Sequence, residues 1–370
     1  MDFDPACLSP EERSSMRLRA LYRQRGYTQY RMSKFEEYDL YAQNKDFLVS
    51  NQVITFTDLT GKLMALKPDV TLSILKNSKP TPRELHKFYY DEQVYRIPKA
   101  AKTYKEIRQV GLECIGPVDR YSCLEVLSLA AASLRALSEQ CLLDLSHMSL
   151  ITGLIRRCGL SQKAGQQALR CFAEKNLHEL AALCAQENVP QQERELLCQL
   201  ATLSGPPRLV LPQLEQTLGS LFPRELEQLS ALTDGLEQAG FGDMLHIDFS
   251  VVNNMSYYDG LVFRGFLKGL STAILAGGQY GKLAQEMGLS TDAIGFAVYL
   301  DLLEQLSDDP VPPDADILLL YGPDADPKAL DAAAAALARD GSSVAVHPTI
   351  PPELRYGRLV TFQGKEGVSR

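Results

Sequence analysis

The sequence predicts an α+β fold with an antiparallel sheet core, a helical insertion and a small C-terminal α/β module. Strand-like segments rich in aromatic and β-branched residues lie on both sides of a leucine- and glutamine-rich region that proline and glycine interrupt. A proline-rich stretch then precedes one more strand–helix–strand pattern. The predicted division is 1–148 and 240–306 for the core, 149–239 for the insertion, and 307–370 for the linker and module.

The first part of the core predicts one amphipathic helix followed mainly by strands. Pro10-Glu11-Glu12 is typical of a helix start, and Gly26 is typical of its end. Alternating and aromatic residues then favour strands that begin an antiparallel sheet. The expected elements, in chain order, are a helix over 10–25, a strand over 27–30, a hairpin of 53–58 with 62–66, a helix over 68–76, and a hairpin of 87–96 with a strand ending at 115.

The sequence after residue 148 predicts helices first and then strands. Short helical segments between prolines indicate the insertion, and an alanine-rich helix closed by Gly341 belongs to the C-terminal module. The expected elements are helices over 149–239, strand character over 244–251 and on to 276, an apolar helix from about 293 that includes Leu302, a linker over 307–314, and a strand, helix and strand over 317–321, 327–339 and 343–347.

The amino-acid composition and net charge argue against several classes of function. The 370-residue chain is 45% hydrophobic and 23% charged, and no apolar run approaches the ~20 residues that a membrane span needs. A net charge of −8 opposes polyanion binding, so transfer RNA is a disfavoured partner. The acidic N-terminus lacks the pattern of a secretion signal. We therefore expect a cytoplasmic protein that binds neither membrane nor tRNA.

The cysteines and histidines do not indicate a metal site. Eight cysteines are scattered without a C-x-x-C pair and do not cluster with the five histidines. Several lie beside leucine in helical runs, where a reduced thiol behaves as a small apolar group. We expect no metal, no cofactor and no catalytic nucleophile.

Three short motifs carry the most information. They are Val252 to Gly260 (VNNMSYYDG), Gly277-Gly278-Gln279-Tyr280, and Ala293 to Ala297 (AIGFA). Together they resemble the core of the histidyl-tRNA synthetase family, which implies a class II aminoacyl-tRNA synthetase-like fold. The arginines of that family are replaced here by Asn253, Gln279 and Leu302. Since adenylate transfer needs cations over the ATP phosphates, the resemblance implies a synthetase scaffold without its ligase chemistry.

A pocket for a free amino acid needs acceptors for its ammonium and donors for its carboxylate. Asp69 and Thr71 occupy the positions that hold the ammonium in the synthetase family. Aspartate after a proline is equally typical of a helix cap, and this alternative stays open.

The remaining candidates come from the same resemblance. It implies that Gln109 and Glu113, four residues apart on one strand face, contact the amino acid's backbone and an imidazole side chain. Arg96 would bridge its carboxylate. The aromatic candidates, each of which alone is more typical of a core, are Tyr257, Tyr258 and Tyr280.

Other positions depart from the synthetase pattern. The loop after Arg96 carries lysines, which cannot form the bidentate forks of arginine. Serine replaces a proline of the dimerisation motif and an aspartate of the pocket. The lysines are Lys99, Lys102 and Lys105, and the serines are Ser33 and Ser256.

The combination resembles the histidyl-tRNA-synthetase-like regulatory subunits of ATP phosphoribosyltransferase over most of residues 10–306. This implies a non-catalytic partner of the short-form catalytic subunit in the first step of histidine biosynthesis, with histidine as effector and a homodimer within a hetero-oligomer. Two alternatives remain: an amino-acid-activating ligase that uses Arg96 and the lysine loop, and a purely structural subunit whose pocket Asp69 and Ser256 have made silent.

Overall fold

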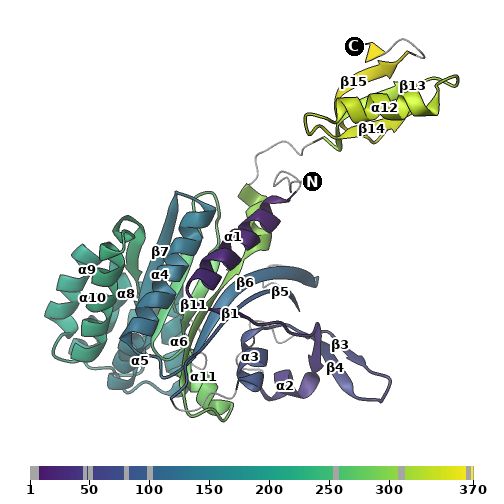
Figure 1. The fold of residues 1–370 in the computed structure, drawn as a ribbon. Helices are drawn as coiled ribbons and strands as arrows, with labels where there is room; N and C mark the ends of the chain where they lie inside the picture. Colours follow the sequence, from purple (N-terminus) through teal and green to yellow (C-terminus); the bar gives the residue numbers. More distant parts are fainter. Residues whose placement is uncertain are drawn as a thin grey trace. The chain divides into compact units, whose positions relative to one another are not determined.

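The structure, a computed structural model, forms two compact units, Met1–Leu306 and Ser307–Arg370, and each is considered by itself. It describes residues 8–44, 48, 53–78, 83–97, 103–252, 258–306, 313–363 and 368–369. The first unit is built on a nine-stranded sheet (Figure 1). The strand order is β1 (Thr28–Gln29), β5 (His86–Arg96), β6 (Lys105–Gly116), β12 (Asp292–Tyr299), β11 (Leu275–Gln279), β10 (Leu261–Leu267), β7 (Cys141–His147), β9 (Leu245–Asp248) and β8 (Ser204–Gly205).

The sheet is mainly antiparallel, as predicted. The candidate site residues that the structure describes lie on or beside its strands β5, β6, β11 and β12. The long hairpin of β5 and β6 was expected, and its register pairs Tyr90 with Gly111. The short strand β1 differs from the prediction because it pairs parallel to β5. Strands β7 and β9 are also parallel.

One face of the sheet packs against helices, and the other carries the polar candidates. Helices α1 (Pro10–Gln24) and α4 (Arg120–Leu137) share a core cluster with Val110 and Leu112 of β6. Successive strand residues point to opposite faces. Gln109, Gly111 and Glu113 therefore face away from α1 and α4, and we call this side the open face.

Helices follow β7, as the sequence predicted, and pack into the same core cluster as the sheet. In Figure 1 helices α8, α9 and α10 gather at the β7 end of the unit. Residues 149–239 belong to the same compact unit as the strands. The assignment of this region as a helical insertion therefore stays a prediction. The helices are α5 (Met148–Arg157), α6 (Gln162–Ala173), α7 (Leu177–Gln186), α8 (Gln191–Thr202), α9 (Pro207–Leu218), α10 (Pro223–Gln238) and the 3-10 turn η3 (Gly242–Met244).

The predicted apolar helix from about 293 is wrong. Strand β12 runs to Tyr299, and the 3-10 helix η4 (Leu300–Leu306) follows it. Ile294, Phe296 and Val298 enter the core on one face, while the intervening positions carry small residues. This is the two-residue alternation of a strand, but the alanines and glycine between the larger side chains made the run look like a uniformly apolar helix.

A smaller three-stranded sheet borders the open face. It contains the predicted hairpin and a short strand that was not predicted, in the order β2–β4–β3. Its helices share a second core cluster with the open-face side chains Tyr90 and Tyr280. The elements are β2 (Phe35–Glu37), α2 (Tyr38–Gln43), β3 (Thr55–Thr57), β4 (Leu63–Leu66) and α3 (Thr71–Asn77), with α11 (Gly281–Glu286) following β11.

In the described residues of the second unit, 313–363 and 368–369, one helix accompanies a four-stranded sheet. Its first strand, helix and second strand were predicted, whereas β15 and β16 were not. The elements are β13 (Ala315–Tyr321), α12 (Pro327–Leu337), β14 (Val344–His347), β15 (Tyr356–Phe362) and β16 (Val368–Ser369). Most of the predicted linker, 307–312, lies outside the described residues. Among the residues that are described, no helix is long and apolar enough to cross a membrane.

Candidate functional site

Glu113 is the centre of the site on the open face. The residue is 2% exposed. The Thr71 hydroxyl donates a hydrogen bond to Glu113 Oε1 at 2.8 Å, and the Tyr280 hydroxyl donates to Oε2. Thr71 begins α3 and Tyr280 directly follows β11. Three predicted residues, which are far apart in the chain, therefore meet at one carboxyl group.

Two glycines leave room for this carboxyl group. In the register, Glu113 lies opposite Gly295 of β12, and Gly295 lies opposite Gly278 of β11. A Cβ at position 295 would overlap Glu113 Oε2 and would lie 2.5 Å from the Leu112 carbonyl oxygen. The side chain of Glu113 can thus lie across the neighbouring strand only because residue 295 has no side chain.

Burial is the main influence on the charge of Glu113. The pKa of the carboxyl is raised from 4.5 to about 8, because burial and, to a smaller extent, the nearby Asp69 carboxylate raise it by more than the Tyr280 and Thr71 hydrogen bonds lower it. Glu113 therefore holds a proton at neutral pH when the site contains no compensating cation. The same carboxyl can accept or donate a hydrogen bond according to what binds beside it.

Asp69 precedes the N-cap residue Val70 and bonds to the first turn of a helix. Its Oδ1 accepts a hydrogen bond from the backbone N–H of Leu72 at 2.9 Å, at the start of α3. Burial raises the pKa of this carboxyl, and the positive charge of Arg96 partly opposes that rise. The residue as a whole is half-buried. Asp69 thus satisfies a backbone N–H of the first helical turn from the position before the N-cap, and its ammonium-binding role stays a prediction.

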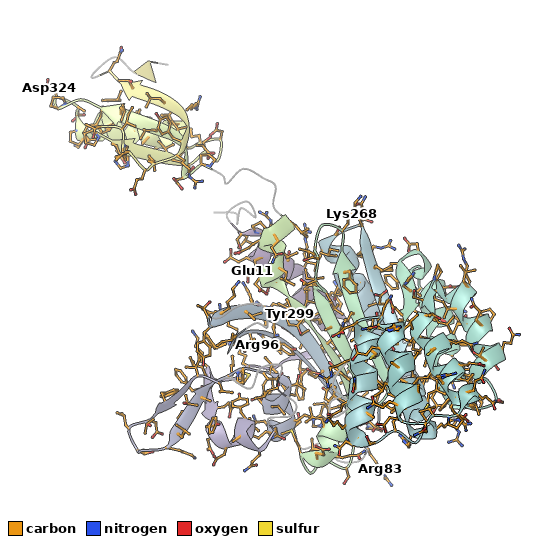
Figure 2. All side chains as sticks on the ribbon, turned by 180° about the vertical axis from the view of Figure 1, so that it is seen from behind. Glu11, Arg83, Arg96, Lys268, Tyr299 and Asp324 are labelled. Atoms are coloured by element: carbon orange, nitrogen blue, oxygen red, sulfur yellow. The ribbon has the colours of Figure 1, made fainter. Side chains whose placement is uncertain are left out.

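Arg96 places a positive charge at the other end of the site. It ends β5 and is 6% exposed. Its guanidinium carbon lies 5.8 Å from the centre of the Tyr299 ring (Figure 2). No carboxylate of the described residues lies within 4.0 Å of the guanidinium. Because a buried charge without a counter-ion is costly, this position favours an anionic ligand group.

Gln109 lies between these groups on β6. It is opposite Tyr299 of β12 and is 4% exposed. Its side chain makes no hydrogen bond to another described residue. The amide thus offers a donor and an acceptor opposite Tyr299, the residue that the Arg96 guanidinium overlies.

The tyrosine predictions have different outcomes. Tyr280 reaches Glu113, and the ring of Tyr258 covers Gly278, since a Cβ there would lie 2.6 Å from Tyr258 Cδ1. Burial and the nearby charges of Glu113 and Asp69 raise the pKa of the Tyr258 hydroxyl well above its usual range. Tyr257 lies outside the described residues, together with Asn253, Ser256, Lys99 and Lys102.

Two tyrosines of the site were missed from the sequence. Tyr90 crosses over Gly111, because a Cβ at 111 would lie 2.5 Å from the Tyr90 hydroxyl oxygen. Tyr299 supports Arg96. The alternation along 87–96 already placed Tyr90 on one strand face, but only the register with Gly111 shows that this face is the open one.

The positions that replace the synthetase arginines have other structural roles. Gln279 Oε1 accepts a hydrogen bond from the backbone N–H of Leu261 at 2.8 Å. Leu302 lies on η4 and packs against the core cluster of α1 and α4. Leu302 is therefore not on the predicted helix. It packs on the helix-covered side of the sheet, so the expectation that it stands beside the ligand is corrected.

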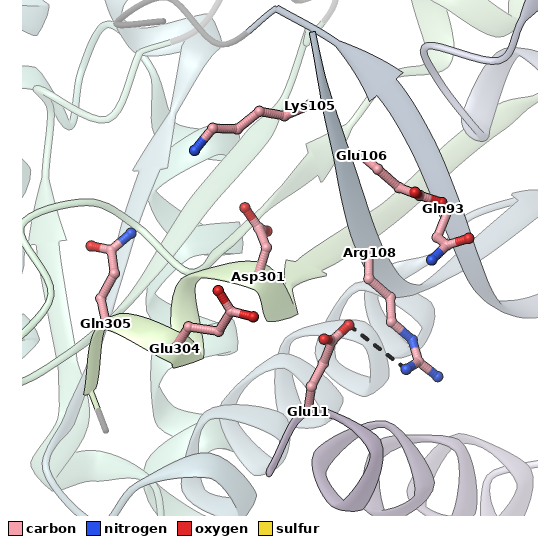
Figure 3. Close-up of a pocket in the computed structure, with 8 residues that line it drawn as sticks. All are labelled: Glu11, Gln93, Lys105, Glu106, Arg108, Asp301, Glu304 and Gln305. Carbon is pink, nitrogen blue, oxygen red and sulfur yellow. Dashed lines mark ion pairs between the residues drawn. The ribbon is translucent and has the colours of Figure 1, made fainter. Parts of the chain in front are cut away.

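A separate polar cavity of about 530 Å³ lies between α1, the hairpin of β5 and β6, and η4 (Figure 3). Of the predicted candidates within the described residues, only Lys105 lines it. Arg108 is already engaged there by Glu11 at 3.7 Å and, through Nε, by Asp91 at 2.8 Å. The lining residues are Glu11, Gln93, Lys105, Glu106, Arg108, Asp301, Glu304 and Gln305. Within the described ranges, no group of three or more metal-ligating side chains is arranged to hold an ion.

The chain is similar to known proteins over most of its length. A family model described as histidyl-tRNA synthetase matches residues 1–303. The ATP phosphoribosyltransferase regulatory subunit of Thermus thermophilus is 30% identical over 294 residues, which cover 78% of this chain and 77% of that protein.

Two solved structures have the same fold. One, described as an ATP phosphoribosyltransferase regulatory subunit/histidyl-tRNA synthetase from Bacillus halodurans, superposes with a TM-score of 0.77 at 21% identity, covering 98% of this chain and 96% of that one. A chain of the ATP phosphoribosyltransferase complex from Thermotoga maritima superposes with a TM-score of 0.62 at 18% identity, covering 81% and 98%.

Proposed function

The chain belongs to the histidyl-tRNA-synthetase-like family of ATP phosphoribosyltransferase regulatory subunits, and from this premise we propose that it binds free histidine and regulates a separate catalytic phosphoribosyltransferase without activating amino acids itself. The observation that carries the proposal is the placement of Glu113 and Arg96. A buried acceptor and a buried cation without a carboxylate partner border one open face. A small zwitterion with an imidazole side chain matches both ends of this arrangement.

The chemistry of histidine fits the described groups. Its carboxylate would bond to Arg96, a charge-assisted contact that is stronger than a neutral one. Its ammonium would face the carboxylate of Asp69, where the Leu72 N–H bonds to Oδ1 and not to Oδ2. The imidazole would bond to Glu113, which Thr71 and Tyr280 hold in place. Glu113 can serve either protonation state of the ring, because it accepts when ionised and donates when protonated.

The absence of ligase activity is proposed from the replaced arginines. Gln279 bonds to a backbone amide and Leu302 packs in the core, so neither would supply charge to a triphosphate. Loss of one such donor typically lowers turnover about a hundred- to a thousandfold, and several are replaced. The partner is proposed by analogy with the Thermotoga maritima complex, and feedback would require only that histidine bind two states with different affinity.

Calorimetry with free histidine tests the sensing role. We expect saturable binding by the purified chain, and about a hundredfold weaker binding for Glu113→Ala, because a hydrogen bond to a charged ring is lost. Lys62→Met is the control, since Lys62 pairs with Glu37 on the exposed hairpin. If histidine does not bind up to millimolar concentration, the pocket is silent.

The regulatory role needs its own assay. Activity of a short-form phosphoribosyltransferase is measured with and without this chain, and then with histidine added. We expect stimulation by the chain that histidine changes. Histidine-dependent exchange of labelled pyrophosphate into ATP by the chain alone would instead establish the ligase alternative.

Asp69→Asn separates the bond to the first helical turn from ligand binding. Asparagine accepts such a bond as well as aspartate, so the free energy of unfolding should change by less than about 0.5 kcal/mol. Histidine affinity should fall roughly tenfold or more, because the ammonium loses a charged acceptor. Urea unfolding and calorimetry measure the two effects. Unchanged affinity would leave Asp69 with its bond to the first helical turn only.

A further inference from the structure

Lys67 is a buried cation next to the candidate site. It is 1% exposed, and its ammonium forms an ion pair with Glu92 of β5. Its backbone joins the small sheet to the large one, since its N–H donates to the Lys34 carbonyl at 3.1 Å and its carbonyl accepts from the N–H of Tyr95 at 2.9 Å. It directly follows β4 and stands two residues before Asp69. A lysine this deeply buried requires a partner, and Glu92 provides it.

Glu92 lies on the open face of β5, the strand that ends at Arg96. It pairs with Gln109 of β6, and Gln109 pairs with Tyr299 of β12. Side chains directly opposite in a sheet have Cβ atoms about 5 Å apart. The guanidinium of Arg96 lies over Tyr299. Arg96, four residues after Glu92 on the same face of β5, itself pairs with Lys105, and only its guanidinium extends to Tyr299.

The structure nevertheless keeps Glu92 and Arg96 apart. Glu92 bonds to Lys67, and its Oε1 also accepts a hydrogen bond from the backbone N–H of Met32 at 3.3 Å. No ion pair joins Glu92 to Arg96 among the described contacts. An arginine fork binds one carboxylate well. If Glu92 occupied it, a ligand carboxylate would find no donor there.

We propose that Lys67 is a positioning residue that holds Glu92 away from Arg96 and so keeps the guanidinium open for the carboxylate of a bound amino acid. The inference rests on the proposed histidine site. Without Lys67, the partly buried Glu92 carboxylate, whose side chain is 14% exposed, would lose its counter-ion. Arg96 is a buried cation on the same face of β5, and pairing with it would neutralise both groups while closing the site.

Four chains test the proposal: the wild type, Lys67→Met, the double variant Lys67→Met/Glu92→Gln, and the control Lys62→Met. Calorimetry should show histidine affinity roughly ten- to a hundredfold lower in Lys67→Met, the size of a lost charge-assisted bond. The double variant should regain most of the lost histidine affinity, because a neutral glutamine does not compete with the ligand carboxylate for the Arg96 guanidinium. Loss that the double variant does not restore would assign Lys67 a purely structural role and overturn the proposal.

A crystal structure of Lys67→Met tests the positioning role independently of histidine. We expect a Glu92 carboxylate within 4.0 Å of the Arg96 guanidinium, a contact that the wild-type structure lacks. A Glu92 side chain that turns to solvent instead would contradict the proposal even if the wild type binds histidine. If the wild type does not bind histidine while the new ion pair forms, the proposed function fails and the positioning role of Lys67 stands.

Lys67→Arg covers the case in which Lys67→Met does not fold. Arginine retains the cation and can still pair with Glu92, so histidine affinity should stay within about threefold of the wild type and no Glu92–Arg96 pair should form. A tenfold loss in a folded Lys67→Arg chain, with Glu92 still paired to residue 67, would contradict the proposal.

Discussion

A methyl group at position 295 is expected to disrupt both the fold and the site. In Gly295→Ala the new Cβ would overlap Glu113 Oε2 and would lie 2.5 Å from the Leu112 carbonyl oxygen, where real Cβ atoms do not approach under 3.0 Å. The Leu112 carbonyl is part of a strand backbone and cannot turn away as a flexible side chain can. We expect the free energy of unfolding to fall by about 3 kcal/mol, at the upper end of overpacking effects.

Gly295→Ala should also abolish histidine binding, because Glu113 must leave its place between Thr71 and Tyr280. Urea unfolding and calorimetry measure the two losses. The control is Gly322→Ala, since a Cβ at 322 has nothing within 4 Å and should change stability by less than about 0.5 kcal/mol. A Gly295→Ala chain with unchanged stability would show that β12 and β6 are spaced more widely than described.

The hairpin of β5 and β6 could be predicted because its signal is local. Aromatic residues over 87–96 favour a strand, and the two-residue period places Gln109 and Glu113 on one face. The pattern cannot tell which strand lies beside them. The meeting of Thr71, Glu113 and Tyr280 was inferred from resemblance to a family, since pairing between distant strands leaves no periodic trace in the sequence.

The misread strand β12 shows where local patterns fail. Its open face carries Ala293, Gly295 and Ala297, and at Gly295 the side chain of Glu113 lies where a Cβ would be. Small residues between large apolar ones obscure the alternation and imitate a buried helix. The small residue that leaves room for Glu113 therefore also hides the two-residue alternation that would have predicted the strand.

Lys67 and Glu92 were missed for a related reason. A lysine and a glutamate in the sequence are more often solvated than buried. Their pairing depends on the chain between β4 and α3 folding against β5, which neither segment specifies alone. Asp69 differs because its local signal, an aspartate after a proline before a helix, correctly indicated a side-chain bond to the first helical turn.

Glu113 should make stability depend on pH. Burial raises its pKa to about 8 in the folded chain, against 4.5 when solvated. Between these values the folded state holds a proton that the unfolded state releases. The stability that Glu113 contributes is therefore complete below about pH 4.5 and is lost as the pH rises to 8, by an amount of up to roughly 4 kcal/mol.

Glu113→Gln should remove this dependence, because glutamine resembles the protonated carboxyl at every pH. Relative to the wild type, the variant should gain about 2–4 kcal/mol of unfolding free energy between pH 5 and pH 8. Urea unfolding at both pH values measures it. Any fixed cost of replacing the acceptor of Thr71 or Tyr280 shifts both measurements equally, so the difference in slope reports Glu113 together with its effect on the neighbouring Asp69 carboxyl. Asp144, whose pKa burial raises to about 7, gives a slope of the same sign in both chains and cancels. Parallel pH profiles would mean that Glu113 is ionised in the folded chain, with a cation from elsewhere beside it.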